Sequence, residues 1–142
     1  MLEFIDHIES PTAPTLVLLH GYGSNKEDLF GLQPYFKGIN LVCFQAPIDM
    51  GTGGYAWYPI DWNNGAKIIN CEEVASAKSL VLDAVNQWTS SNQISGRLVL
   101  GGFSQGAILS IAVYAGGFRA DGYVFLSGYA LPEWHHLLSS FE

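Results

Sequence analysis

The fold predicted for this chain depends on the stretch Leu98-Val99-Leu100-Gly101-Gly102-Phe103-Ser104-Gln105-Gly106-Ala107-Ile108-Leu109-Ser110-Ile111. A short apolar run with β-branched character leads into Gly-x-Ser-x-Gly and then directly into an apolar stretch of helical length. A strand, this motif and a helix in that order predict a nucleophile elbow, with the serine on a strained turn. Glycine is expected at both flanks, because a side chain there would collide with the adjacent strand or helix. We therefore predict that Ser104 is a nucleophile. The alternative is an ordinary glycine-rich turn.

Length and composition indicate a single domain, residues 1–142, with a large buried core. Apolar residues make up 49% of the chain and charged residues 13%. A net charge of −7 with only six Lys and Arg disfavours binding to nucleic acid or to an anionic membrane. No apolar run is long enough to span a bilayer, and the acidic N-terminal segment is unlike a signal peptide. The two cysteines, Cys43 and Cys71, lack metal-ligand spacing. We expect a cytoplasmic protein.

Apolar runs alternate with stretches of helical character, which predicts a mostly parallel sheet with helices on both faces. The expected strands cover residues 15–19, 39–44, 98–103 and 123–127, with a short edge strand within residues 1–8.

Two further helices are expected besides the one that follows Ser104. The first begins with a capping box of Ser24 and Glu27, carries Leu29, Leu32 and Phe36 inward, and bends or breaks near a proline. The second covers residues 70–88 and has apolar side chains at steps of three and four, which gives one buried stripe.

A long connection at residues 48–67 is rich in glycine and aromatic residues. Connections of this length inside a compact domain are usually functional. Its aromatic side chains, among them Trp57 and Tyr58, either line an acyl pocket or hold the loop against the body. The sequence leaves both interpretations open.

Four motifs in order resemble the phospholipase/carboxylesterase family, which includes bacterial carboxylesterases and acyl-protein thioesterases. They are His20-Gly21-Tyr22-Gly23-Ser24 with Asp28-Leu29, Ala56-Trp57-Tyr58, Gly102-Phe103-Ser104-Gln105-Gly106 and Leu126-Ser127-Gly128-Tyr129. The resemblance implies an α/β-hydrolase fold and hydrolysis of small acyl esters or thioesters through a Ser-Asp-His triad, without metal or cofactor.

The resemblance also assigns roles to individual residues. Ser104 matches the nucleophile, and Tyr22 and Gln105 match the residues whose backbone amides form the oxyanion hole, as the elbow itself predicts. Tyr22, Trp57 and Tyr58 are expected near the substrate. The histidine at position 20 is expected to shape its loop rather than to act as the catalytic base, and Asp28 to cap or anchor the loop and the helix that follows.

The catalytic acid and base of the family lie beyond the strand at residues 123–127, on two further strands and their loops. The resemblance therefore covers the N-terminal two thirds of the family fold and lacks the last strands and helices. Within this chain, His135 and His136 are the candidates for a substitute base, with Glu133 or Asp121 orienting one of them. The alternative is a pair of solvated histidines.

The last expected strand is apolar on both faces, and without further strands it lies at an exposed edge. We therefore expect a second polypeptide to cover it, either a second copy in a homo-oligomer or a separate chain that completes the fold. The predicted function is ester or thioester hydrolysis with the triad partners absent from this chain or supplied by another. The alternative is a non-catalytic, hydrolase-like interaction module.

Overall fold

The computed structural model describes residues 1–138, and within them five strands form one sheet in the order β1-β3-β2-β8-β9. Strands β2, β3, β8 and β9 are parallel, and β1 is antiparallel to β3 at one edge. These strands are β1 (Phe4–His7), β2 (Thr15–Leu19), β3 (Asn40–Phe44), β8 (Leu98–Phe103) and β9 (Gly122–Leu126). The predicted α/β class and mostly parallel sheet are confirmed.

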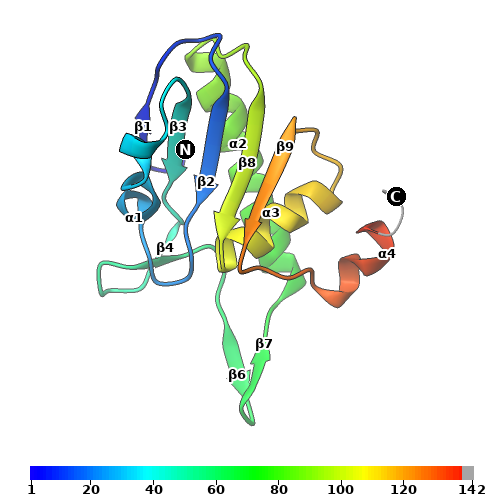
Figure 1. Cartoon of the computed structure of the whole chain (residues 1–142). Helices are drawn as coiled ribbons and strands as arrows, with labels where there is room; N and C mark the ends of the chain where they lie inside the picture. The colour runs from blue at the N-terminus through cyan, green and yellow to red at the C-terminus, as the bar shows by residue number, and fades with distance from the viewer. Residues whose placement is uncertain (139–142) are drawn as a thin grey trace.

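Helices cover both faces of the sheet, and each face has its own apolar cluster (Figure 1). On one face lie α2 (Cys71–Ser91) and α3 (Gln105–Ala115), packed on the alternate strand residues Val17, Val42 and Leu100. On the other face, α1 (Lys26–Phe30) covers only the side formed by β1, β3 and β2. The part of this face formed by β8 and β9 has no helix of the described chain on it.

The predicted capping box at Ser24 is wrong. Asn25 caps α1, and its side-chain oxygen accepts a hydrogen bond from the backbone N–H of Asp28 at 3.1 Å. The Ser24 hydroxyl instead donates to the Asp28 carboxylate. Asp28 thus joins the turn to the helix that follows, because its backbone N–H binds the Asn25 side chain and its carboxylate binds the Ser24 hydroxyl.

The helix expected to carry Leu29, Leu32 and Phe36 inward is shorter than predicted. It ends at Phe30, and a 3₁₀ helix, η1 (Gln33–Tyr35), follows it. A proline at the start of η1 has no N–H to continue the α-helical pattern, so the chain turns there. Leu29 and Phe36 pack on the sheet, whereas Leu32 is exposed.

The second predicted helix is observed as α2, capped by Asn70, and its buried residues include every member of the predicted stripe. They are Val74, Ala77, Val81, Ala84, Val85 and Trp88.

The connection at residues 48–67 contains two small antiparallel ribbons. Strands β4 (Ile48–Asp49) and β5 (Tyr55–Ala56) form the first. Strands β6 (Asp61–Asn63) and β7 (Ala66–Ile68) form a hairpin that projects away from the sheet (Figure 1).

The C-terminal segment, for which the sequence shows no strong pattern, forms a short 3₁₀ helix, η2 (Pro132–Trp134), and then α4 (His135–Leu138). The last four residues of the predicted domain, 139–142, lie outside the described residues.

Candidate active site

Ser104 lies between β8 and α3 and has the strained backbone of a nucleophile elbow, with φ 55° and ψ −114°. Its N–H donates to the carbonyl of Leu126 on β9 at 2.8 Å, and its carbonyl accepts from Ile108 at 3.0 Å. These two bonds hold the turn between the sheet and the helix. The serine side chain therefore stands at the C-terminal ends of the parallel strands, where α/β sheets bind ligands.

The two flanking glycines allow α3 to pass close to the sheet. A Cβ on Gly102 would lie 2.6 Å from the carbonyl oxygen of Leu19, and a Cβ on Gly106 would overlap the same oxygen. Neither contact is possible for a real side chain, so both positions require glycine for reasons of space rather than of φ.

The loop after β2 lies beside the elbow because β2 and β8 are adjacent, with Leu19 in register with Gly102. A Cβ on Gly21 would be 3.5 Å from the Cβ of Ser104. The segment around β5 fixes this loop: the N–H of Gly23 donates to the carbonyl of Tyr55 at 2.9 Å. The backbone of Tyr22 is thereby held next to the serine.

The backbone N–H groups of Tyr22 and Gln105 make no hydrogen bond within residues 1–138. Gln105 is the first residue of α3, where backbone N–H groups have no partner in the helix and the helix dipole is positive. Two free donors thus flank Ser104, which is the arrangement that stabilises a negative oxygen.

The Gln105 side chain has a structural function that sequence reasoning did not find. It is buried, and its oxygen accepts from the backbone N–H of Trp57 while its amide donates to the carbonyl of Tyr58, both at 2.8 Å. The indole N–H of Trp57 donates to the carbonyl of His20 at 2.8 Å. These bonds join the elbow helix, the aromatic connection and the loop after β2 into one unit.

His20 is buried, and both of its ring nitrogens bind the backbone. Nδ1 lies 2.8 Å from the carbonyl of Gly21, and Nε2 accepts from the N–H of Ala46 at 3.0 Å. Burial lowers the pKa of the imidazole, although the bond to Gly21 acts in the opposite direction. Because the His20 ring is neutral and both of its nitrogens are already hydrogen-bonded, it holds the shape of its loop and cannot accept a proton from a serine.

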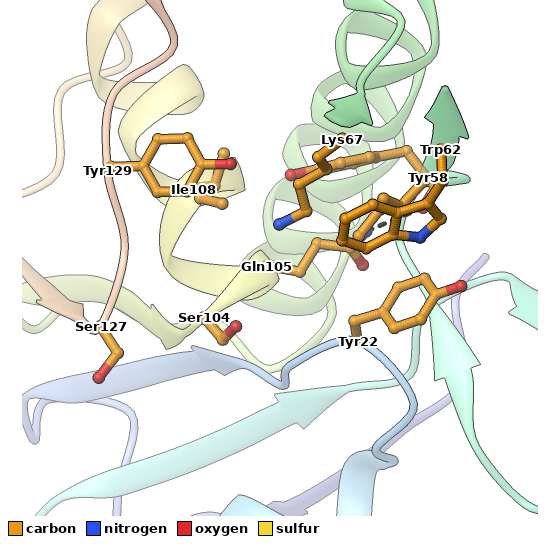
Figure 2. A pocket seen from close by; sticks show the side chains of 10 residues that line it. Tyr22, Tyr58, Trp62, Lys67, Ser104, Gln105, Ile108, Ser127 and Tyr129 are labelled. Carbon is orange, nitrogen blue, oxygen red and sulfur yellow. Dashed lines mark hydrogen bonds between the residues drawn. The ribbon is translucent and has the colours of Figure 1, made fainter. Parts of the chain in front are cut away.

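A pocket of about 240 Å³ opens beside Ser104 (Figure 2). The residues that line it come from the elbow, the loop after β2, the hairpin β6–β7 and the segment after β9: Tyr22, Tyr58, Ile60, Trp62, Lys67, Ser104, Gln105, Ile108, Ser127 and Tyr129.

Of the residues predicted near the substrate, Tyr22 and Tyr58 line this pocket, and Trp57 does not. Trp57 is 2% exposed and packs in the core with its ring beside His20. Each of the two interpretations of the aromatic connection therefore holds for one of two neighbouring residues: Tyr58 lines the pocket, and Trp57 holds the loop against the body.

Sequence reasoning included Trp62 only among the aromatic residues of the connection and missed Lys67, which lies opposite it in the β6–β7 hairpin. The length of the connection was a signal that it has a function. The hairpin register that brings Trp62 and Lys67 to the pocket could not be derived from that length.

Neither His135 nor His136 lines the pocket. His135 is exposed, and its Nε2 lies 3.3 Å from the carbonyl of Ala130. The Ser104 hydroxyl makes no hydrogen bond to another residue of the described chain. The geometry of residues 1–138 thus supplies an elbow, two donors and a pocket, without a base against the serine.

The sequence of residues 2–137 matches the family model described as phospholipase/carboxylesterase. The chain belongs to the phospholipase/carboxylesterase family. This match confirms the resemblance and, together with the mostly parallel sheet, the α/β-hydrolase fold.

Solved structures similar to this family member include esterase PE8, at 26% identity and a TM-score of 0.66, with 92% of this chain and 65% of that chain covered. A phospholipase/carboxylesterase from Dyadobacter fermentans is 21% identical, with a TM-score of 0.69, and 92% and 62% of the two chains are covered. Acyl-protein thioesterase 2 from Zea mays is 20% identical, with a TM-score of 0.64, and 98% and 72% are covered. The chain thus spans less than two thirds of the first two relatives.

Two negative findings apply to residues 1–138. No helix there is long and apolar enough to cross a membrane. No group of three or more His, Cys, Asp or Glu side chains there is placed to hold a metal ion.

Proposed function

We propose that Ser104 is the nucleophile of an enzyme that hydrolyses small acyl esters or thioesters. The observation that carries the proposal is the strained φ of Ser104 between β8 and α3, at the mouth of a pocket. Such strain persists where the surrounding structure maintains it, and it is concentrated at active sites. Family membership supports the same reaction class.

In the proposed reaction, the Ser104 oxygen bonds to the acyl carbon and its proton passes to a base. The N–H groups of Tyr22 and Gln105 stabilise the oxyanion. The alcohol or thiol then leaves with a proton, and water releases the acyl group from the serine. The base is a histidine, either His135 or His136 after a movement of the C-terminal segment or a histidine of a polypeptide that completes the fold.

The second candidate is a non-catalytic interaction module. It is favoured by the lack of a histidine lining the Ser104 pocket within the described chain. A serine hydroxyl without a base is a poor nucleophile. Oxyanion stabilisation and binding alone retain only a small part of the activity of a triad.

Labelling with a fluorophosphonate probe distinguishes the two candidates. We expect the wild-type chain to be labelled and Ser104→Ala not to be. Ser127→Ala is the matched control, because Ser127 lines the same pocket and also has a positive φ. Labelling that survives Ser104→Ala and disappears with Ser127→Ala would overturn the assignment. A folded wild-type chain that resists the probe would exclude His135 and His136 as the base, and resistance that persists with the polypeptide that completes the fold would support the interaction module.

We further propose that a second polypeptide covers β9, as a copy of this chain or a separate one. The exposed apolar residues Val124, Leu126 and, on the neighbouring strand, Phe103 support this, because they lie on the sheet face that α1 leaves open. Sedimentation of the isolated chain tests it: a monomer at all micromolar concentrations argues against the homo-oligomer.

We also propose a cytoplasmic location, which the free thiols of Cys43 and Cys71 support.

A further inference from the structure

The Ser104 pocket contains one charged side chain, Lys67, and none of its lining residues is acidic. Lys67 and Trp62 are paired across the β6–β7 hairpin, so both project from the same face of it. Asp61 alternates with Trp62 and belongs to the opposite face. Figure 2 shows the Lys67 side chain reaching into the pocket on the side where Trp62 and Tyr58 lie.

The Lys67 ammonium has no carboxylate partner within residues 1–138. Its Nζ atom lies over the ring of Tyr129 in a cation–π contact, 5.8 Å from the ring centroid. Glu133 lines a neighbouring cavity together with Lys67, yet no ion pair joins them. This chain has 13 acidic residues and six Lys and Arg. An unpaired cation in a pocket with an acid-free lining is therefore a specific feature of this site.

A second, independent polar group has no partner at the same place. The hydroxyl of Tyr58 is buried and makes no hydrogen bond in the described structure, although Tyr58 lines the pocket. Buried polar atoms are nearly always hydrogen-bonded, so an exception at a pocket points to a ligand. Burial raises the pKa of this phenol, which keeps the O–H in its donor form.

From these groups we propose that the pocket binds the free carboxylate of an acyl group derived from a dicarboxylic acid, with Lys67 and the Tyr58 hydroxyl as its partners. The ammonium supplies the charge, and the phenol donates one hydrogen bond. The aromatic rings around them and Ile108 contact the methylene chain. The inference names a substrate class for the site of the proposed function and so rests on that function: esters or thioesters of short dicarboxylic acids with one end free.

Binding of unreactive amides tests the inference without requiring a working nucleophile. The N-ethyl monoamides of succinic, glutaric and adipic acid are compared with the N-ethyl amides of butanoic, pentanoic and hexanoic acid, in which a methyl replaces the carboxylate. Binding to the full chain is followed through the backbone amides of Lys67 and Trp62 in ¹⁵N–¹H NMR spectra.

We expect at least one charged amide to bind about fivefold more tightly than its neutral counterpart at low ionic strength. Added salt should reduce the preference, because Lys67 is exposed to solvent. Lys67→Met should abolish the preference and leave the neutral amides unaffected, whereas Lys67→Arg should retain it. Lys37→Met, which removes an exposed charge outside the pocket, is the matched control and should also retain it. Tyr58→Phe should reduce it about twofold.

Equal binding of all charged and neutral amides by the wild-type chain would overturn the inference, as would a preference that survives Lys67→Met. Failure of the proposed function is seen separately, as a lack of fluorophosphonate labelling at Ser104. Because the NMR measurement does not depend on that labelling, each proposal can fail alone.

Discussion

The buried side chain of Gln105 accepts a hydrogen bond of 2.8 Å from the backbone N–H of Trp57, 48 residues earlier in the chain. Gln105, whose backbone N–H is one of the two proposed oxyanion donors, thus also fixes the aromatic connection. Its side chain holds Tyr58, which lines the pocket beside Ser104.

Replacing Gln105 by alanine should lower the free energy of unfolding by about 1–3 kcal/mol, because the N–H of Trp57 and the carbonyl of Tyr58 would be left buried without partners. Urea denaturation measures the change. The exposed Gln87 on α2 is the control, and Gln87→Ala should stay within about 0.5 kcal/mol of wild type. Equal effects of the two substitutions would contradict the role of the buried amide.

Gly106→Ala should destabilise the fold by about 3 kcal/mol or more, since the added methyl overlaps the carbonyl oxygen of Leu19 and the helix must move from the sheet. Gly122→Ala on β9 is the matched change, because its Cβ would meet a side-chain carbon of Val99 at an ordinary 3.5 Å. We expect thermal unfolding to show a large loss for the first variant and a change below about 1 kcal/mol for the second. A stable Gly106→Ala protein would mean that α3 and β2 are not in close contact.

Stability should fall as the pH is lowered below about 6.5, the usual pKa of histidine, because of His20. Its pKa is lowered in the folded chain, so the unfolded chain binds the proton more readily below that pH and unfolding is favoured. Urea denaturation between pH 5.5 and 7.5 should show a slope that His20→Gln removes. A slope that persists in His20→Gln would assign it to another group.

Tyr58→Phe should raise the free energy of unfolding by about 1 kcal/mol, because it removes a buried hydroxyl that has no partner. Tyr123→Phe is the matched change with the opposite sign: the hydroxyl of Tyr123 donates to the carbonyl of Phe118 at 2.7 Å, and its loss should cost about 1 kcal/mol. Denaturation curves of the two variants measure the difference. Equal losses of stability in the two variants would mean that the Tyr58 hydroxyl is hydrogen-bonded in the protein without ligand.

Most of the fold follows from local patterns in the sequence. The strands around Leu18, Val42 and Leu100 are apolar runs buried in the sheet, and α2 has an unambiguous stripe. The elbow is predictable because its glycines are required by contacts that any such turn must make. The sequence predicts Ser24 rather than Asn25 as the cap of α1, because both residue types are good caps. Tertiary contacts determine which of the two neighbours occupies the cap position.

The pocket was harder to predict than the elbow. Trp57 and Tyr58 are adjacent, similar in size and both buried in the core, yet only Tyr58 also lines the Ser104 pocket. That division depends on the Gln105 clamp, a contact between residues far apart in sequence. Lys67 was not predicted because its position follows from the pairing of a hairpin, which composition alone does not reveal.

The hairpin β6–β7 stands outside the sheet and still contributes Trp62 and Lys67 to the pocket (Figure 1). Its six strand residues are exposed, so the hairpin adds little to the core. Substitutions in this hairpin should therefore leave the positions of Ser104 and of the backbone N–H groups of Tyr22 and Gln105 unchanged. Under the two proposals, the nucleophile and the oxyanion donors lie in the loop after β2 and at the start of α3, whereas the lysine that recognises the substrate carboxylate lies on a hairpin outside the sheet.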